Sequence, residues 1–369
     1  MFSVGAAAIQ QSFAVSHQGL VWALLLAPGL AAVALEPIIF LLADRWPRRP
    51  FVAGGLFVMG LASIACALAP SPLLFTVALS VSFVANSCGV ELAQATLVDA
   101  HPADRERALA RWTFAGAIGD LGAPLVVAGL ALLGYGWRAG FLAMAVGLLV
   151  AAAALARAPF PPHAAADDDE PEPSLWSAMR TAVGNRRLLG WLLATSLCDW
   201  LDEILVVLAV VHMREHLGAG AVERSLVIGA YVAGSLVGLA ALERALARFP
   251  AHHILVGSAA ACAAAFGLWL VAPTVWLSAV LLAVVGVTAA PLYPLTMAQA
   301  YAASPGRSGA VHAAGRVLTP LSLGVPWLLA WIADSHGTGT ALAAILVAPV
   351  TMTLLALSLP PAARVDRVD

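Results

Sequence analysis

The residues HMREH, at positions 212–216, have a spacing that could support metal chemistry. Histidines four residues apart lie on one face of a helix and can hold a zinc ion, with Glu215 as general base, as in the inverted zinc-peptidase signature H-x-x-E-H. The motif, however, directly follows the apolar run ILVVLAVV and precedes the polar loop LGAGAVER, and no third ligand can be assigned. We therefore expect no enzyme, no bound metal and no cofactor. A membrane-embedded zinc peptidase remains the alternative from another functional class.

A second group of reactive side chains is acidic and lies inside an apolar segment. In CDWLDEILV, Asp199, Asp202 and Glu203 are spaced i, i+3 and i+4, and Thr195 lies one turn earlier. On a helix these four share one face. Charged groups are costly inside a bilayer, so we interpret them as a candidate path for substrate and protons. The alternative is a polar contact between helices near the outer surface.

Further ionisable residues interrupt other apolar segments: Glu36, Glu91, Asp120 and Arg316. One arginine cannot neutralise six carboxylates, so some of these acids must be hydrated or protonated. Hydrated or protonated carboxylates of this kind are what proton-coupled transport requires. Neutral side chains that could line the same path are Asn86, Gln94, Tyr293 and Met297, although such residues often serve only packing.

Composition identifies the class of protein. Hydrophobic residues make up 61% of the 369 residues, charged residues only 11%, and the mean hydropathy is +0.90. These values indicate a polytopic membrane protein in a lipid bilayer. No basic patch of the kind that binds nucleic acid is present, and the four cysteines lie far apart inside apolar runs. Eleven runs are long enough to span: 19–42, 52–69, 73–96, 112–134, 138–156, 188–211, 225–242, 254–272, 275–299, 310–333 and 340–359.

The chain divides into two similar halves. Arg45-Trp46-Pro47 is echoed by Arg248-Phe249-Pro250, and two further turn pairs repeat at the same offset of 203 residues. We predict helix bundles at 1–156 and 188–359, a cytoplasmic acidic, proline-rich linker at 157–187, and a cytoplasmic tail at 360–369. Segment 188–211 maps to positions up to about residue 8, so we expect the chain to begin inside its first helix, with most of that helix lacking. The segment SLWSAMRTAVGNRR is expected to form a short surface helix.

Arginine placement predicts the orientation. With the linker on the cytoplasmic side, fifteen arginines lie inside and three outside, with Arg316 in the membrane. This bias follows the positive-inside rule. We expect a multi-pass protein of a bacterial plasma (inner) membrane, with linker and C-terminus cytoplasmic.

The loop FLLADRWPRRPFVAGG resembles the signature G-x-x-x-D-R-x-G-R-R between helices 2 and 3 of the major facilitator superfamily (MFS). Asp44, Arg45, Arg48 and Arg49 match it, whereas Phe40 and Pro47 replace its glycines. The segments AIQQSFAVS, LVDAHPADRERALA, GYGWRAGFL and PGRSGAV are also similar to that superfamily. The helix 4 arginine of proton-coupled drug antiporters is lacking between Leu73 and Val98, and GAIGDLGAP only approximates their helix 5 signature.

The resemblance implies an all-α integral membrane fold of two pseudo-symmetric six-helix bundles, here eleven full spans plus a partial first helix. It implies that helices 1, 4, 7 and 10 line a central cavity and that Asp44, Arg45, Arg48 and Arg49 act in a cytoplasmic gate; a loop that only sets topology is the other interpretation. We further predict that Glu36 and Arg316 pair across the interface between the halves and hold the cytoplasmic side closed. The alternatives are that Arg316 pairs with Glu91 or reaches the cytoplasmic surface.

The expected activity is secondary active transport of a small molecule by alternating access in a monomer, with proton-coupled export as the first choice. A metabolite uptake permease, by uniport or symport, is the nearest alternative. A non-transporting membrane sensor is the other, and it would bind ligand without moving it.

Overall fold

The computed structural model describes residues 2–16, 19, 22–161 and 174–359, and every regular element in those ranges is a helix. The chain falls into two compact units. The first holds residues 1–100, 118–182 and 306–316, and the second holds residues 101–117, 183–305 and 317–369. The predicted tail 360–369 and residues 162–173 of the predicted linker lie outside the described residues. The bundle boundaries at 156 and 188 therefore stay a prediction.

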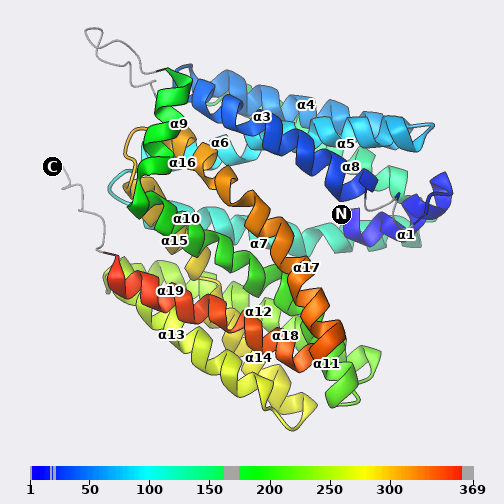
Figure 1. Ribbon diagram of the computed structural model, residues 1–369. Coiled ribbons are helices and arrows are strands. Elements are labelled where there is room, and N and C mark those ends of the chain that lie inside the picture. Colours follow the sequence, from blue (N-terminus) through cyan, green and yellow to red (C-terminus); the bar gives the residue numbers. More distant parts are fainter. Residues whose placement is uncertain (1, 17–18, 20–21, 162–173, 360–369) are drawn as a thin grey trace. The chain divides into compact units, whose positions relative to one another are not determined.

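The first unit contains most of the helices drawn from blue to cyan in Figure 1. They are α1 (Phe2–Phe13), the π-helical turn η1 (Trp22–Leu26), α3 (Ala27–Ala43), α4 (Arg48–Leu68), α5 (Pro72–Asn86), the π-helical turn η2 (Ser87–Glu91), α6 (Leu92–Ala100), α8 (Trp137–Arg157), α9 (Leu175–Gly184, up to residue 182) and α16 (Ser308–Gly315). Helix α7 (Arg105–Leu132) contributes residues to both units. Helix α5 packs on both α3 and α4, and α8 packs on α4.

The second unit is built from α10 (Arg186–Asp199), the π-helical turn η3 (Trp200–Ile204), α11 (Leu205–His216), α12 (Ala221–Leu246), α13 (Ala251–Leu270), α14 (Val275–Ala289), α15 (Leu292–Ala302), α17 (Thr319–His336), α18 (Thr338–Ile345) and α19 (Val347–Ser358). The short 3₁₀ turn η4 (Arg316–Leu318) joins α16 to α17.

Helix boundaries follow local sequence chemistry. The Ser71 hydroxyl accepts from the Leu74 amide at 3.3 Å and begins α5, and Asn185 Oδ1 accepts from the amides of Arg187 and Leu188 at 3.1 Å each to begin α10. Such caps satisfy amides that lack a partner within the helix. Gly337, with φ of +89°, separates α17 from α18, a backbone conformation that glycine tolerates best.

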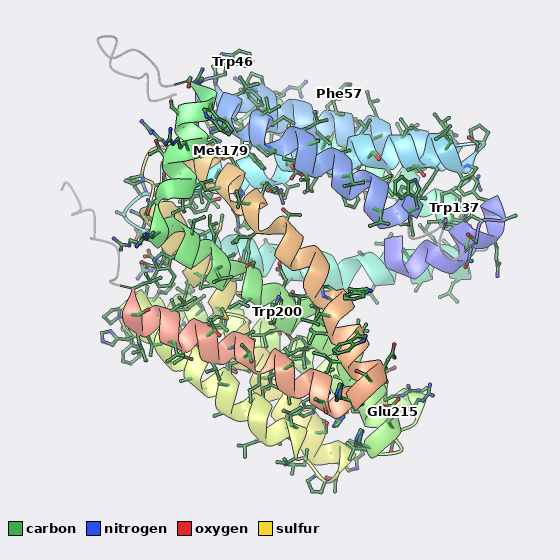
Figure 2. The ribbon with its side chains drawn as sticks, in the orientation of Figure 1. Trp46, Phe57, Trp137, Met179, Trp200 and Glu215 are labelled. Atoms are coloured by element: carbon green, nitrogen blue, oxygen red, sulfur yellow. The ribbon has the colours of Figure 1, made fainter. Side chains whose placement is uncertain are left out.

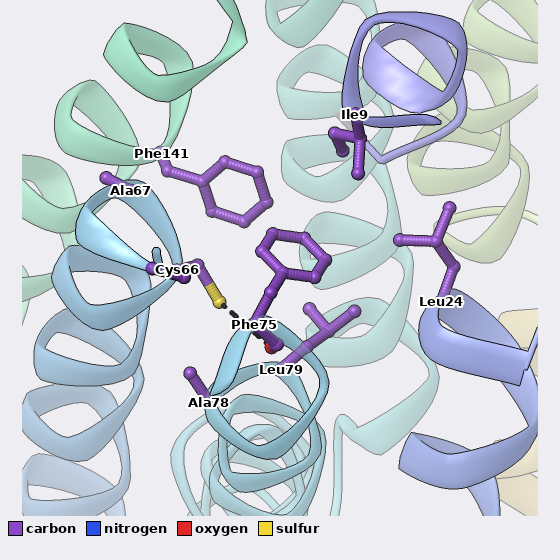
Figure 3. Close-up of a cluster of buried hydrophobic side chains, with 9 residues drawn as sticks. Ile9, Leu24, Cys66, Ala67, Phe75, Ala78, Leu79 and Phe141 are labelled. Atoms are coloured by element: carbon purple, nitrogen blue, oxygen red, sulfur yellow. Dashed lines mark hydrogen bonds between the residues drawn. The ribbon is translucent and has the colours of Figure 1, made fainter. Parts of the chain in front are cut away.

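The core of the first unit has an aromatic centre (Figure 3). Phe75 is buried and meets Phe141 and Trp137 edge-on, at ring-centroid distances of 5.7 and 5.6 Å. The Cys66 thiol is buried beside them and donates to the Phe75 carbonyl at 3.9 Å. Edge-to-face geometry is the favoured arrangement for aromatic rings, so this cluster fixes α4, α5 and α8 against one another.

The core of the second unit depends on glycines where α12 crosses α14. A Cβ added to Gly234 would lie 2.1 Å from the Ala283 carbonyl oxygen, and one added to Gly286 would lie 2.2 Å from the Tyr231 carbonyl oxygen. Only glycine permits this backbone approach, which is a common way for helices to associate in lipid. Nearby, the buried Trp269 indole donates to the Ser278 hydroxyl at 2.6 Å.

Within the described residues, nine helices are long and apolar enough to cross a membrane. They cover nine of the eleven predicted spans. The other two, 188–211 and 310–333, are not among these nine. The first contains the π-turn η3 with three acids around it, and the second is broken by η4 at Arg316. The predicted surface helix is present as α9.

Candidate functional site: an ion-pair cluster and an acidic helix

The first candidate site is an ion-pair cluster in the first unit. Its carboxylates come from Glu36 on α3 and Glu91, the last residue of η2, and its cations come from α16 and the residue after it. We call the set Glu36, Glu91, His312 and Arg316 the arginine cluster. A π-turn shifts side chains out of the ordinary helical register, and such turns often occur at functional positions. Here η2 presents Ser87 and Glu91 toward the same cluster.

Arg316 contacts both carboxylates of the cluster. Its Nη2 donates to the two oxygens of Glu91 at 2.7 and 2.8 Å, and its Nε forms an ion pair with Glu36 Oε2. Glu36 is buried and also accepts from the Ser87 hydroxyl. The predicted contact between Glu36 and Arg316 is therefore present together with its alternative, the contact to Glu91. Whether these contacts form a gate stays a prediction.

His312 lies one helical turn before Arg316 and completes the cluster. Its Nδ1 is 3.3 Å from Glu91 Oε2. Its ring stacks on Phe40 at a centroid distance of 5.1 Å, and the Arg316 guanidinium lies 5.6 Å from the same Phe40 ring. The cluster thus joins two carboxylates, one guanidinium and one imidazole.

Asp44 joins the loop after α3 to the first turn of α16. Its two carboxylate oxygens accept from the amides of Gly309 and Ala310 at 2.8 Å each, and from Arg48 Nη2 at 2.5 Å. Asp44 thereby caps α16, because a helix N-terminus presents free amides and partial positive charge to a carboxylate. Burial raises the pKa of Asp44, although Arg48 and the two amides favour its charged form.

Ser308 and Gly309 make that contact possible. The Ser308 hydroxyl donates to Asp99 Oδ2 at 2.5 Å and accepts from Arg48 Nη2 at 2.9 Å. A Cβ at Gly309 would lie 2.2 Å from the Phe40 carbonyl oxygen, so only glycine allows α16 to lie this close to α3.

The second candidate site is the acidic stretch of the second unit. Asp199 ends α10, and Asp202 and Glu203 lie in η3, whose first residue Trp200 is labelled in Figure 2. All three acids are exposed. The π-turn was not predicted, and it widens the i, i+3, i+4 spacing assumed for a regular helix. The buried Tyr231 hydroxyl donates to the Leu201 carbonyl at 2.8 Å, which holds η3 against α12.

The remaining predicted residues are spread over both units. Thr195 donates to the Trp191 carbonyl and contacts the Thr296 hydroxyl at 3.1 Å, so it supports the contact between α10 and α15. Tyr293 and Asn86 are half-buried, and Asp120 is exposed on α7. In the loop that precedes α4, Arg45 is half-buried. Arg49, in the first turn of α4, donates to the Ala156 carbonyl at the end of α8.

The HMREH residues have structural contacts instead of a ligand arrangement. Glu215, labelled in Figure 2, accepts from the Thr338 hydroxyl at 2.8 Å. His212 is buried, and its ring stacks on His216 at 4.3 Å. Among the residues that the structure describes, no group of three or more histidine, cysteine or acidic side chains could hold a metal ion.

Sequence reasoning missed three contributors to the arginine cluster and its surroundings: His312, Ser308 and Asp99. His312 could have been found, because it lies four residues before Arg316 in an otherwise apolar run and must share its helical face. Ser308 and Asp99 are 209 residues apart, and no local pattern connects them.

Comparisons with known proteins identify the family. Residues 1–201 match the family model described as Major Facilitator Superfamily. The drug efflux pump JefA of Mycobacterium tuberculosis is 34% identical over 143 residues, which cover 38% of this chain and 28% of JefA. The multidrug resistance protein Stp of the same species is 33% identical over 141 residues, covering 36% and 25%. These matches thus span about a quarter of the length of each relative.

Solved structures share the fold over nearly the whole chain. FucP, the fucose:proton symporter of E. coli, superposes in its outward conformation with a TM-score of 0.75 at 15% identity, covering 98% of this chain and 90% of FucP. A bacterial homologue of the iron transporter ferroportin gives 0.69 at 18% identity, covering 96% and 94%. The all-helical membrane fold expected from the sequence is confirmed.

Proposed function

Since the chain belongs to the Major Facilitator Superfamily, as its match over residues 1–201 shows, we propose that it is a secondary transporter that exports a small molecule in exchange for protons. This is a family of transporters and not of enzymes, so the zinc-peptidase alternative is set aside. The chain is a multi-pass membrane protein. Its placement in a bacterial plasma membrane with a cytoplasmic linker belongs to the proposal.

One observation carries the proposal: three exposed carboxylates, Asp199, Asp202 and Glu203, interrupt an apolar helical segment. Exposed acids in a spanning segment are tolerated where they meet water or a partner. They can attract an organic cation and can also bind protons, and competition between the two at one site couples their movements. The drug efflux named for JefA and the multidrug resistance named for Stp support the export direction.

The arginine cluster supplies the conformational element in this proposal. α16 is held to α3 and η2 by Arg316 with its two carboxylates, and by Asp44 at its N-terminus. For the cytoplasmic side to open, α16 must leave these partners, and water must replace them. Hydration of the separated charged groups offsets part of the electrostatic attraction that is lost. The closed state can therefore be the more stable one and still open.

Inside-out membrane vesicles acidified in the lumen test the export direction. We expect accumulation of organic cations such as tetraphenylphosphonium or ethidium, and its collapse when the proton gradient is dissipated. Asp199→Asn should abolish it, whereas Asp334→Asn, an exposed acid elsewhere in the second unit, should not. Accumulation only in right-side-out vesicles would instead support the uptake permease. Binding without accumulation in either orientation would support the sensor.

A further inference from the structure

A groove in the second unit lies where the first turns of α7 meet the last turns of α12. It has a volume of about 540 Å³. Its lining comes from both helices: Arg107, Ala110, Arg111, Phe114, Leu239, Ala240, Glu243, Arg244 and Ala247. No residue of the arginine cluster or of the acidic stretch lines this groove, so the groove is distinct from both candidate sites.

The groove carries a net positive charge. Three arginines and one glutamate line it, which leaves two excess positive charges. Arg111 donates to Glu243 through Nε at 2.9 Å and also through Nη2, but both side chains are exposed to solvent, and such pairs contribute little. Arg244 Nη1 donates to the Ala240 carbonyl of its own helix at 3.1 Å. Arg107 Nη1 lies 3.9 Å from Asp104 Oδ1, and Arg107 Nη2 donates to the Leu246 carbonyl at 3.5 Å. Solvent-accessible contacts of this kind are weak, so an anion can compete for all three guanidinium groups.

Charge and apolar surface are arranged along the groove in a definite order. α7 and α12 are both candidate membrane spans, and the arginines lie near the beginning of α7 and the end of α12. Phe114 and Leu239 lie one to two turns further into the same spans. A molecule with an anionic headgroup and hydrocarbon chains could place its headgroup at the arginines and its chains along the apolar residues. A free inorganic anion would not contact the apolar part of the groove.

We propose that this groove binds the headgroup of an anionic phospholipid, with Arg107, Arg111 and Arg244 on the phosphate and the acyl chains along Phe114 and Leu239. Basic pockets between helices at the cytoplasmic surface bind such headgroups. By the arginine bias, this end of both helices is cytoplasmic. Glu243 opposes the headgroup and tunes its affinity. The proposal concerns lipid binding and does not depend on which substrate is moved.

Native mass spectrometry of the purified full chain, with phosphatidylglycerol or phosphatidylcholine added to the detergent, measures the binding. Each arginine near an anionic lipid contributes about a fivefold factor in affinity. We expect phosphatidylglycerol to bind the wild type tighter than phosphatidylcholine. Arg107→Gln and Arg244→Gln should each lose about fivefold in affinity for phosphatidylglycerol. The matched control is Arg224→Gln near the opposite end of α12, which should bind as the wild type does.

Glu243→Gln provides a test that misfolding cannot mimic, because it predicts a gain. Removing the opposing carboxylate should tighten phosphatidylglycerol binding by about fivefold and leave phosphatidylcholine unchanged. Unchanged or weaker binding in Glu243→Gln would overturn the proposal, as would equal affinity for the two lipids. Displacement of phosphatidylglycerol by millimolar inorganic phosphate would show a simple phosphate site and also overturn it.

Discussion

Replacing Arg316 with glutamine should destabilise the first unit more than any exposed arginine substitution. The change removes the ion pair with Glu36 and both hydrogen bonds to Glu91. Glu36 is left with the Ser87 hydroxyl, and Glu91 is left with His312. A carboxylate that keeps its charge in such a place lacks both water and a cation.

The exposed fractions set the size of the effect. The Glu36 side chain is 5% exposed and that of Arg316 is 27% exposed, so solvent screens these pairs much less than it screens a surface pair. Breaking a buried pair by removing one partner costs about 3–5 kcal/mol. At pH 7 the loss cannot exceed about 3.7 kcal/mol, because the glutamate that loses its partner can bind a proton instead of staying charged. This limit is the difference between pH 7 and an ordinary glutamate pKa of about 4.3, multiplied by about 1.36 kcal/mol per pH unit. We therefore expect a loss of about 3 kcal/mol.

The same argument gives the pH dependence and its sign. In the variant the folded state holds more protons than the unfolded state between pH 4.3 and 7, so stability falls as pH rises. At pH 5 the loss should shrink to about 1 kcal/mol.

SDS-driven unfolding of the purified protein, at pH 7 and pH 5, measures both values. Arg307→Gln is the matched control, because Arg307 lies on the same segment and is exposed. It should lose less than about 0.5 kcal/mol. Glu36→Gln combined with Arg316→Gln should recover part of the stability. Equal losses for the Arg316 and Arg307 variants, or a loss that grows on acidification, would refute the reasoning.

Three further substitutions test packing contacts. Gly309→Ala should lower the melting temperature and impair transport, because the new methyl group overlaps the carbonyl oxygen of Phe40, and a binding assay would separate the two effects. Gly234→Ala should destabilise the second unit by about 2 kcal/mol or more through overpacking, whereas Gly229→Ala on the same helix meets open space and should be neutral or slightly stabilising in thermal unfolding. Ser278→Ala leaves the buried Trp269 indole without its acceptor and should cost about 1–3 kcal/mol in the same measurement; no change would mean that water replaces the hydroxyl.

The family and the fold could be predicted from the sequence, because hydropathy and arginine placement are properties of each segment by itself. Apolar runs define helices in a bilayer whatever their neighbours are, and the loop from Asp44 to Arg49 carries a recognisable pattern. The π-turns were not accessible. η2 and η3 lie in runs whose composition is ordinary for a helix, and the shifted register is fixed by tertiary contacts such as that of Tyr231 with the Leu201 carbonyl.

The candidate site was predicted in part. The sequence identified Glu36, Glu91 and Arg316 as costly charges in apolar runs, since burial of a charge requires a partner. It predicted Glu36 as the partner of Arg316 and Glu91 as the alternative, and in the structure Arg316 contacts both. The cap that Asp44 forms on α16 was not predicted, because a sequence shows only neighbours along the chain and α16 lies more than 260 residues away from Asp44.

Proton movement coupled to substrate movement tests the central proposal most directly. Proteoliposomes containing the purified chain and the pH dye pyranine, with a gradient of tetraphenylphosphonium, should show proton flux opposite to the flux of the cation. Asp199→Asn should eliminate the proton flux while Asp334→Asn preserves it. Cation flux in the wild type without any change in the internal pH would contradict proton-coupled export by this chain.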